Sequence, residues 1–432
     1  MKKIVLFFTF FLLSSFVYGF ELDASENIPS NNEMVEKNVA FREQFGLNSH
    51  ENRVKDIVQN SSSKEKYGYF FTEEEFENLN SRIAEQESSI PQIKRILGSD
   101  YTLFIDQKNG GITNIGTKES IKSSEKNQIL SLFEDDDKIN FYNVNYTSND
   151  LTTIVQEISE DRKTIASNYN IEILGVSSDI QSETIDIQIN EPTDKKVNIL
   201  QELYGKDLIT VSKGYVQKND AYESNRFNHP GYIFGGAAIA KDRSESTSYT
   251  YADCSAGFTA RSYASPFYYY VITAGHCADS SGQNWYQGGT FIGDWVSSKD
   301  VEDGNVDAGA IHLSVNTSNW VAGNGNTQHI QLNNSASSSE HVEGRAACIS
   351  GMKSGTNCGI IEDSYSCATF DNGYFCGVQT DYTAVGGDSG ATVFTYYNNT
   401  LLGIHKGGTT HEWYSRVNNV AADLNITPLA DL

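Results

Sequence analysis

The sequence is short of basic residues. It contains 32 lysines and arginines against 56 aspartates and glutamates, which gives a formal net charge of −24 at pH 7. Proteins that bind nucleic acids use clustered lysine and arginine side chains to displace the counterions of the phosphate backbone. The sequence has no such basic patch, so we expect no nucleic-acid partner.

Long apolar runs are also scarce. The one present is at the start, where Met1–Lys3 precede a mostly apolar segment, Ile4–Val17. This pattern is typical of a secretory signal peptide, and Val17 and Gly19 are small enough for the −3 and −1 positions of a cleavage site after Gly19. A membrane anchor is the alternative, but it requires a longer run. We therefore expect residues 1–19 to be removed on export, and the protein to be extracellular without membrane association.

Cysteine is absent from the first 253 residues. The six cysteines of the chain are Cys254, Cys277, Cys348, Cys358, Cys367 and Cys376. An even number in an exported chain predicts disulfide bonds, although six cysteines allow 15 connectivities. A zinc site is the alternative, but the sequence lacks the Cys-x-x-Cys and His-x₃-His pairs that such sites use. We expect disulfides, and no metal or other cofactor.

The composition changes near residue 230. Of the 35 glycines, 25 follow this point, whereas charged residues are denser before it. Short apolar runs between glycines, with many serines and tyrosines, are typical of an all-β sandwich or barrel. A chain of 432 residues is also too long for one ordinary core. The sequence therefore predicts an all-β second part.

The sequence before residue 230 predicts a mixture of helices and strands, an α+β fold. Thr72 lies three residues before Glu75, a capping box that opens a helix reaching about Glu87. Two extended segments, 101–106 and 112–116, flank Lys108–Gly111 and predict a hairpin. Further helices are expected at 36–45, 51–59 and 194–204, and extended segments at 67–71, 184–189 and 208–212. We find no group of side chains in residues 20–230 that indicates a reaction.

Three short segments of the second part contain residues suited to catalysis. They are His276 within Val271–Cys277, Asp307 within Val306–Ile311 and Ser389 within Gly386–Phe394. Each has an ordinary structural explanation by itself: a structural histidine beside a cysteine, a turn residue at a strand start, and a glycine-rich loop. The presence of all three, in the order His, Asp, Ser, favours catalysis.

The chemistry explains why these residue types belong together. A serine hydroxyl is a poor nucleophile until a neighbouring imidazole takes its proton. An aspartate holds the imidazole in one tautomer and stabilises the imidazolium that forms. A tetrahedral oxyanion needs two backbone N–H groups aimed at one point, and Gly387 and Ser389 would supply them. We expect Ser389 to be the nucleophile, His276 the general base and acid, and Asp307 the residue that orients it.

These segments resemble the chymotrypsin-like serine proteases, above all the bacterial secreted branch that includes the streptogrisins and α-lytic protease. The resemblance covers residues 231–428 and implies two six-stranded antiparallel β-barrels with the triad in the cleft between them. It also implies three disulfides, Cys254–Cys277, Cys348–Cys358 and Cys367–Cys376. Leu402–Gly408 resembles the strand that forms one wall of the primary specificity pocket, where Gly407 and Gly408 would pair with the substrate backbone.

The first part has a weaker resemblance of its own. Phe41–Leu47 and Tyr67–Glu75 are similar to the pro-regions of the same branch, which act as intramolecular chaperones and inhibitors. Such a role suits a disulfide-bonded β fold, whose non-local contacts make folding slow. The resemblance implies a pro-region at residues 20–232 and a protease domain at residues 233–432. An independent binding domain that stays attached is the alternative.

Two positions near the nucleophile depart from the family pattern. Ala391 stands where a glycine is usual, and an alanine is tolerated there if its φ is negative. The alanine also excludes a lipase-type Gly-x-Ser-x-Gly elbow, because the last position of that motif is glycine. Ile349 replaces an arginine that pairs with the aspartate before the nucleophile, here Asp388. A buried carboxylate needs a partner. We expect either a new amino terminus at Ile233, freed by cleavage of the preceding bond, or Lys353.

Three further positions concern the specificity pocket. Lys406 stands where streptogrisins have a serine that helps hold the catalytic aspartate. His405 resembles a residue of the glutamyl endopeptidases that helps bind the substrate's glutamate. Ala384, on the opposite wall, lacks the hydroxyl found in that branch. A medium or large apolar P1 residue, the residue before the cleaved bond, is therefore the default expectation, and glutamate is the alternative.

Together these observations predict a secreted serine endopeptidase that works as a monomer, without a cofactor, through an acyl-enzyme intermediate. Its partners would be protein or peptide substrates and its own pro-region, which would inhibit it. A catalytically inactive homologue that binds a partner through the same cleft is one alternative, and a secreted esterase is another. The presence of all three triad residues counts against the first, and the glycine-rich peptide-binding strand counts against the second.

Overall fold

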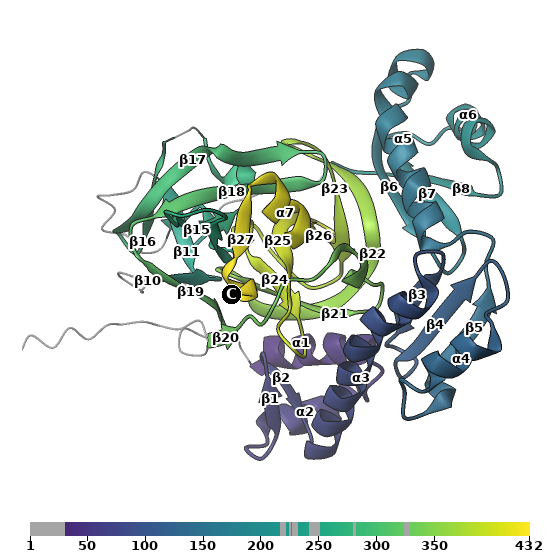
Figure 1. Ribbon diagram of the computed structural model, residues 1–432, viewed down its shortest axis with the longest axis horizontal. Helices are drawn as coiled ribbons and strands as arrows, with labels where there is room; N and C mark the ends of the chain where they lie inside the picture. The colour runs from purple at the N-terminus through teal and green to yellow at the C-terminus, as the bar shows by residue number, and fades with distance from the viewer. Residues whose placement is uncertain are drawn as a thin grey trace, which may run out of the picture.

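The computed structural model describes residues 31–216, 222–223, 226, 232–241, 251–279, 282–323 and 329–432. The signal peptide predicted at residues 1–19 lies outside them. Helices and strands alternate as far as residue 213, a part we call the N-terminal region, and strands predominate from residue 232, the C-terminal region (Figure 1). None of the helices in the described residues is long and apolar enough to cross a membrane.

The N-terminal region begins with a mainly helical part. Its elements are α1 (Asn31–Gln44), α2 (Glu51–Gln59), β1 (Lys64–Lys66), β2 (Tyr69–Phe71) and α3 (Glu73–Leu97). The expected capping box opens α3, because the Thr72 hydroxyl accepts from the Glu75 N–H (3.2 Å) and the Glu75 carboxylate accepts from the Thr72 N–H (3.1 Å). The helix continues past Glu87, where we expected it to end, because its buried apolar stripe goes on through Ile90 and Ile93.

The rest of the N-terminal region contains two small layers of strands and helices. They are built from β3 (Thr102–Asp106), β4 (Ile112–Thr117), α4 (Ser123–Leu130), β5 (Ile139–Asn143), α5 (Ser148–Tyr169), β6 (Ile173–Asp179), β7 (Thr184–Ile189), α6 (Asp194–Tyr204) and β8 (Ile209–Lys213). β3 and β4 form the expected hairpin. The helices α2 and α6 and the strand β7 have their predicted bounds, whereas α5 was not predicted.

The first half of the C-terminal region is built on an eight-stranded sheet with the order β13-β11-β16-β17-β18-β15-β14-β27. The strands are β11 (Ala238–Lys241), β13 (Cys254–Ser255), β14 (Thr259–Ser262), β15 (Tyr269–Thr273), β16 (Asn284–Gln287), β17 (Thr290–Asp303), β18 (Val306–Leu313) and β27 (Ile426–Pro428). The adjacent strands β13 and β14 pair near opposite ends of this order, with β11 and β15 respectively. The sheet is therefore curled around its core.

The second half contains six strands in the order β21-β24-β25-β26-β23-β22. They are β21 (Ala346–Gly351), β22 (Gly355–Phe370), β23 (Gly373–Thr380), β24 (Thr392–Thr395), β25 (Leu401–Gly408) and β26 (Glu412–Arg416), followed by α7 (Val417–Asp423). β21 also pairs with β22, so the first and last strands of this order are neighbours. Fully buried apolar side chains, including Ile349, Val393 and Leu402, fill the interior.

The two regions share one sheet and one core. Strand β6 of the N-terminal region pairs antiparallel with β22, so that β6, β7 and β8 extend the second sheet of the C-terminal region to nine strands (Figure 1). Elsewhere Phe41 and Tyr67 pack against Tyr396 of the C-terminal region, with ring centroids 5.9 and 5.6 Å apart. The N-terminal region therefore docks mainly on the half that contains β21–β26.

Candidate active site

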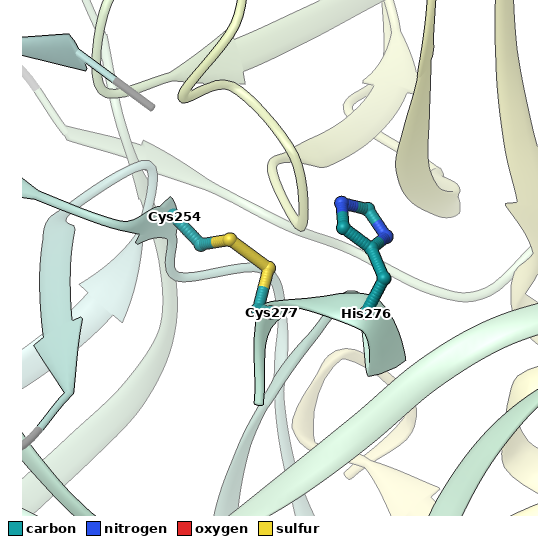
Figure 2. A group of neighbouring side chains, drawn as sticks. All are labelled: Cys254, His276 and Cys277. Atoms are coloured by element: carbon teal, nitrogen blue, oxygen red, sulfur yellow. A yellow bond between two sulfur atoms is a disulfide. The ribbon is translucent and has the colours of Figure 1, made fainter. Parts of the chain in front are cut away.

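His276 lies on a short 3₁₀ turn, Gly275–Cys277, that follows the buried strand β15. Figure 2 shows its imidazole beside the disulfide of Cys254 and Cys277. Ligand atoms of these three residues lie within 4.8 Å of one another, a spacing that a metal could use. Both sulfurs are bonded to each other, however, so neither is available as a thiolate ligand.

All three disulfides that the family resemblance implied are present. Cys254–Cys277 fixes the histidine turn to the segment between β11 and β14. Cys348–Cys358 links β21 to β22, and Cys367–Cys376 links β22 to β23. The first of the three bonds therefore braces the turn that carries His276.

Asp307 lies on β18, which pairs with β15 and so brings the aspartate to the histidine turn. Its Oδ2 is 2.7 Å from His276 Nδ1, and its Oδ1 accepts from the His276 backbone N–H (3.0 Å). The Ser415 hydroxyl accepts from the Asp307 N–H at 2.9 Å. Both carboxylate oxygens thus hold His276, and the imidazole presents its Nε2 away from Asp307.

Lys406, which stands where related proteases have an aspartate-holding serine, completes the surroundings of Asp307. The Lys406 ammonium contacts Asp307 Oδ2, donates to Asn372 Oδ1 (2.7 Å) and lies 3.4 Å from His276 Nδ1. The side chains of Lys406 and Asp307 are each only 2% exposed. Burial by itself would raise the pKa of Asp307, but the charges of His276 and Lys406 and their hydrogen bonds outweigh it and hold that pKa below its usual range.

Ser389 lies in the loop between β23 and β24, flanked by Gly387 (φ 97°) and Gly390 (φ 82°). A Cβ on Gly390 would lie 2.0 Å from Thr273 Oγ1, so only glycine lets this loop approach the end of β15. The Ser389 hydroxyl donates to the Lys406 carbonyl at 3.4 Å, and within the described residues it makes no hydrogen bond to His276. Catalytic hydrogen bonds are often long before substrate binds.

Two backbone N–H groups lie beside the Ser389 hydroxyl. In the part of the chain that the structure describes, the N–H groups of Gly387 and Ser389 donate to no acceptor. The carbonyl of Gly387 is turned to the Ser255 hydroxyl, which donates to it at 2.9 Å. Two unbonded donors beside a serine are the arrangement that an oxyanion hole requires.

Asp388 is fully buried, yet backbone groups satisfy it. Its carboxylate accepts from the N–H groups of Lys353 (2.8 Å), Ser354 (3.1 Å) and Val385 (3.0 Å). Burial raises its pKa, and these hydrogen bonds oppose the rise. Lys353 thus contributes a backbone N–H, while Ile233 lies buried in β10 (Tyr232–Gly235). The proposed pairing of a new Ile233 amino terminus with Asp388 stays a prediction for the cleaved chain.

Two further residues, Ala391 and Arg226, lie near this loop. Ala391, in place of the usual glycine, has a negative φ and donates its N–H to the Asp388 carbonyl at 2.8 Å. Arg226, which the sequence analysis missed, is buried nearby and donates to the Ser350 hydroxyl (2.7 Å) and the Gly236 carbonyl (3.3 Å). Its charge interacts with that of Asp388. Arg226 was missed because it lies outside every recognisable motif.

The expected specificity residues lie on β25 and on the loop before Ser389. Gly407 and Gly408 end β25, and His405 is almost fully buried, with its Nδ1 3.1 Å from the Tyr382 hydroxyl. Burial, together with the nearby charges of His276 and Lys406, lowers the pKa of His405 to about 3. The buried surroundings of His405 therefore favour the neutral imidazole. Ala384 lies on the 381–390 loop, apart from this strand in the sequence.

No protein-family model matches the chain, and no curated protein gives a significant match. Among solved structures, Thermobifida fusca Protease A is 22% identical over 46% of this chain and 98% of its own, with a TM-score of 0.38. Cellulomonas bogoriensis chymotrypsin is 23% identical over 46% and 99%, also at 0.38. A glutamic acid specific serine protease, described as using a histidine triad in substrate binding, is 24% identical over 45% and 100%, at 0.37.

The C-terminal half of this chain has structural matches among bacterial chymotrypsin-like serine proteases.

Proposed function

We propose that this protein is a secreted serine endopeptidase, made as a precursor, with His276, Asp307 and Ser389 as its catalytic triad. The observation that supports this best is the buried His276–Asp307 pair, held through both carboxylate oxygens beside a glycine-flanked serine. This geometry fixes the imidazole with Nε2 available, which a general base for a serine needs.

The reaction follows from these positions. His276 Nε2 takes the Ser389 hydroxyl proton as Oγ attacks the peptide carbonyl, and the Gly387 and Ser389 N–H groups bind the oxyanion. The imidazolium, stabilised by Asp307, then gives its proton to the leaving amine. Water, activated in the same way, hydrolyses the acyl-enzyme and restores Ser389. The chain's own groups supply every proton transfer.

The proposal includes the two six-stranded barrels of that enzyme class. In the second half, β21 pairs with both β24 and β22, which supports closure of six strands. In the first half, the segment 254–262 pairs with β11 at one end and β15 at the other, which supports the same arrangement with β13 and β14 counted as one strand. His276 and Asp307 come from the first half and Ser389 from the second.

We further propose that residues 20–232 are an inhibitory pro-region and residues 233–432 the protease domain. The extensive docking of the N-terminal region supports this. The Tyr69 hydroxyl accepts from the Cys358 N–H at 2.9 Å, and the Lys37 ammonium donates to the Thr356 carbonyl at 2.8 Å. The hairpin that pairs with β6 ends at Asn372, which binds Lys406 of the triad surroundings. Three disulfides suit an oxidising, extracellular location.

An inactive homologue that binds a partner through the same cleft is the second candidate. The observation that favours it is Lys406, whose cation lies 3.4 Å from His276 Nδ1 and so disfavours the imidazolium that catalysis requires. An esterase would share the triad, and comparing peptide with simple ester substrates separates it from a peptidase.

The decisive experiment compares wild type with Ser389→Ala after secretion, measuring casein cleavage, fluorophosphonate labelling and the mass of each product. Active wild type and an unprocessed, inactive variant support both the triad and self-processing. A processed but inactive variant supports the triad and assigns processing to another protease. Processed wild type that neither cleaves nor labels would move the binding-module function ahead. Amino-terminal sequencing tests the Ile233 start.

A further inference from the structure

A buried arginine joins separate segments of the C-terminal region. Arg226 is 5% exposed, and its guanidinium donates to the carbonyl of Gly236 (3.3 Å), the carbonyl of Gly323 (2.8 Å) and the hydroxyl of Ser350 (2.7 Å). Gly236 and Gly323 precede the second half in the chain, and Ser350 lies within it on β21. The carbonyl of Arg226 accepts from the Ala238 N–H at 3.1 Å. Both its side chain and its backbone are therefore part of the C-terminal region.

The chain before Arg226 pairs with the same region. β9 (Tyr222–Glu223) runs antiparallel to β12 (Tyr251–Ala252). A boundary at Ile233 would place β9 and Arg226 on the removed side of the cut, and because no cysteine precedes Cys254, no disulfide could tether them. The three acceptors of the guanidinium are buried, and each would lose this donor. Hydrogen-bonding groups left unpaired in the interior are costly.

Ile233 is itself held in place. It is fully buried in β10, which pairs parallel with β19 (Asn316–Ala322), and its carbonyl accepts from the Thr317 hydroxyl at 3.1 Å. A new amino terminus at Ile233 would have to leave this pairing to reach Asp388. That carboxylate already accepts three backbone N–H groups, and the charge of Arg226 acts on it as well. The folded chain therefore already supplies what the new amino terminus was expected to provide.

Arg226 also fixes one end of the segment that contacts the oxyanion loop. This segment, 350–354, begins with the serine that accepts from the guanidinium. A Cβ on Gly351 would lie 2.2 Å from Asp388 Oδ1, so the carboxylate packs directly on this backbone. Two N–H groups of the segment donate to the same carboxylate, at 2.8 and 3.1 Å. Asp388 is flanked by the two residues whose N–H groups would form the oxyanion hole, so a shift of the segment would move those donors.

We propose that Arg226 is a positioning residue of the mature enzyme, acting on the oxyanion loop through segment 350–354, and that processing leaves it attached to the protease. The inference rests on the proposed endopeptidase function, and it moves the start of the protease domain from Ile233 to a residue no later than Arg226. Arginine suits this role because its planar fork presents donors in several fixed directions, whereas lysine has one ammonium. The arginine touches none of the reacting atoms, and its effect passes through Asp388.

The start of the processed chain is the first test. Amino-terminal sequencing and the intact mass of secreted wild type, measured after denaturation, are expected to show a first residue no later than Arg226. A first residue after Arg226, Ile233 above all, overturns the inference and leaves the triad intact. Fluorophosphonate labelling of Ser389 in a portion of the same sample reports the proposed function separately. Processed protein that does not label overturns that function and the positioning role together.

Arg226→Met and Arg226→Lys test the positioning role, with kcat counted per labelled Ser389. We expect Arg226→Met to lower kcat by about tenfold or more with KM within about threefold, because displaced oxyanion donors weaken transition-state binding more than substrate binding. Arg226→Lys keeps the charge but loses the fork, and its kcat should fall between the two. The matched control is Arg261→Met, since the Arg261 guanidinium lies 4.1 Å from the ring centroid of the exposed Phe267 and should leave kcat unchanged.

A purely structural role for Arg226 predicts a different pattern. Fewer molecules would fold and label, but kcat per labelled site would stay at the wild-type value, and that result overturns the positioning role. If Arg226→Met does not fold, the start of processed wild type and the kcat of Arg226→Lys decide. A chain that labels and cleaves without ever being processed overturns the proposed precursor, and the two Arg226 variants then test the positioning role in the full-length protein.

Discussion

Replacing Lys406 with methionine tests what a buried cation does beside the triad. Methionine keeps the length and apolar character of the side chain but removes its charge. Lys406 and Asp307 are each only 2% exposed, so the aspartate left behind cannot be solvated by water instead. Breaking such a pair from one side costs about 3–5 kcal/mol of unfolding free energy, because a buried charge loses its partner.

The matched control is Lys241→Met. The Lys241 ammonium lies 2.7 Å from Asp279 Oδ1, but the Asp279 side chain is 68% exposed, so water can replace the lysine. Exposed pairs contribute about 0–1 kcal/mol. The two variants therefore make the same chemical change at similar ion pairs that differ in burial.

The effect should depend on pH with a definite sign. The pKa of Asp307 is below its usual value in the folded chain, so the ionised form contributes stability above the unfolded-state value of 3.8, and this contribution is lost as the pH falls through the folded-state pKa. Protonated Asp307 needs no cation. The difference between Lys406→Met and its parent is therefore expected at pH 7 and should shrink in strong acid.

Denaturant unfolding followed by tryptophan fluorescence measures this loss of unfolding free energy, in a Ser389→Ala background that removes the proposed nucleophile. All tryptophans lie in the C-terminal region, at Trp285, Trp295, Trp320 and Trp413, so the signal reports the part that contains the pair. A Lys406→Met that is destabilised no more than Lys241→Met would refute the electrostatic reasoning.

Three further predictions rest on individual contacts. Asp307→Asn should lower kcat by about 10⁴-fold with the circular dichroism spectrum unchanged, since it disturbs the His276 tautomer. Tyr69→Phe should lower the unfolding free energy by about 1–3 kcal/mol by leaving the buried Cys358 N–H unpaired, with the exposed Tyr169→Phe nearly neutral. Burial raises the pKa of Asp363 to about 7, and it accepts hydrogen bonds from Ser178 of β6. When the N-terminal region undocks, Asp363 should regain its ordinary pKa, so docking takes up a proton and is favoured at lower pH. In gel filtration of Ser389→Ala cut between the two regions, the N-terminal region should stay bound to the C-terminal region at pH 5 and be released more readily at pH 8.

Local sequence signals predicted the parts of the fold that local physics determines. The Thr72–Glu75 capping box, the alternation in β7 and the amphipathic α6 all depend on residues close in sequence, and each was found where expected. The helix α5 was missed although Thr147 and Asp150 form a capping box at its start. Its apolar stripe is diluted by threonines and serines, which weakens the periodicity that identifies a helix.

The residues of the candidate site likewise fall into those that adjacent sequence reveals and those that only the folded chain brings together. The segments around His276, Asp307 and Ser389 are recognisable because each carries its chemistry in a few adjacent residues. The contact of Lys406 with Asp307 joins residues 99 positions apart, and only the family resemblance, which places Lys406 where a serine holds the aspartate, pointed to it. Glu412 is similar, because only the pairing of β26 with β25 brings its carboxylate to 3.6 Å from His405.

The pairing of β6 with β22 has a consequence for the proposed removal of the N-terminal region. The backbone groups of Cys367 and Ala368 that face Val176 and Gly175 would become an open sheet edge. Such an edge is a template for adding a strand from another molecule. The Cys367–Cys376 bond keeps this hairpin in its two-stranded form, so the edge would persist. In the proposed precursor, removal of the N-terminal region would therefore expose a new surface for self-association in the same step that frees the proposed protease domain.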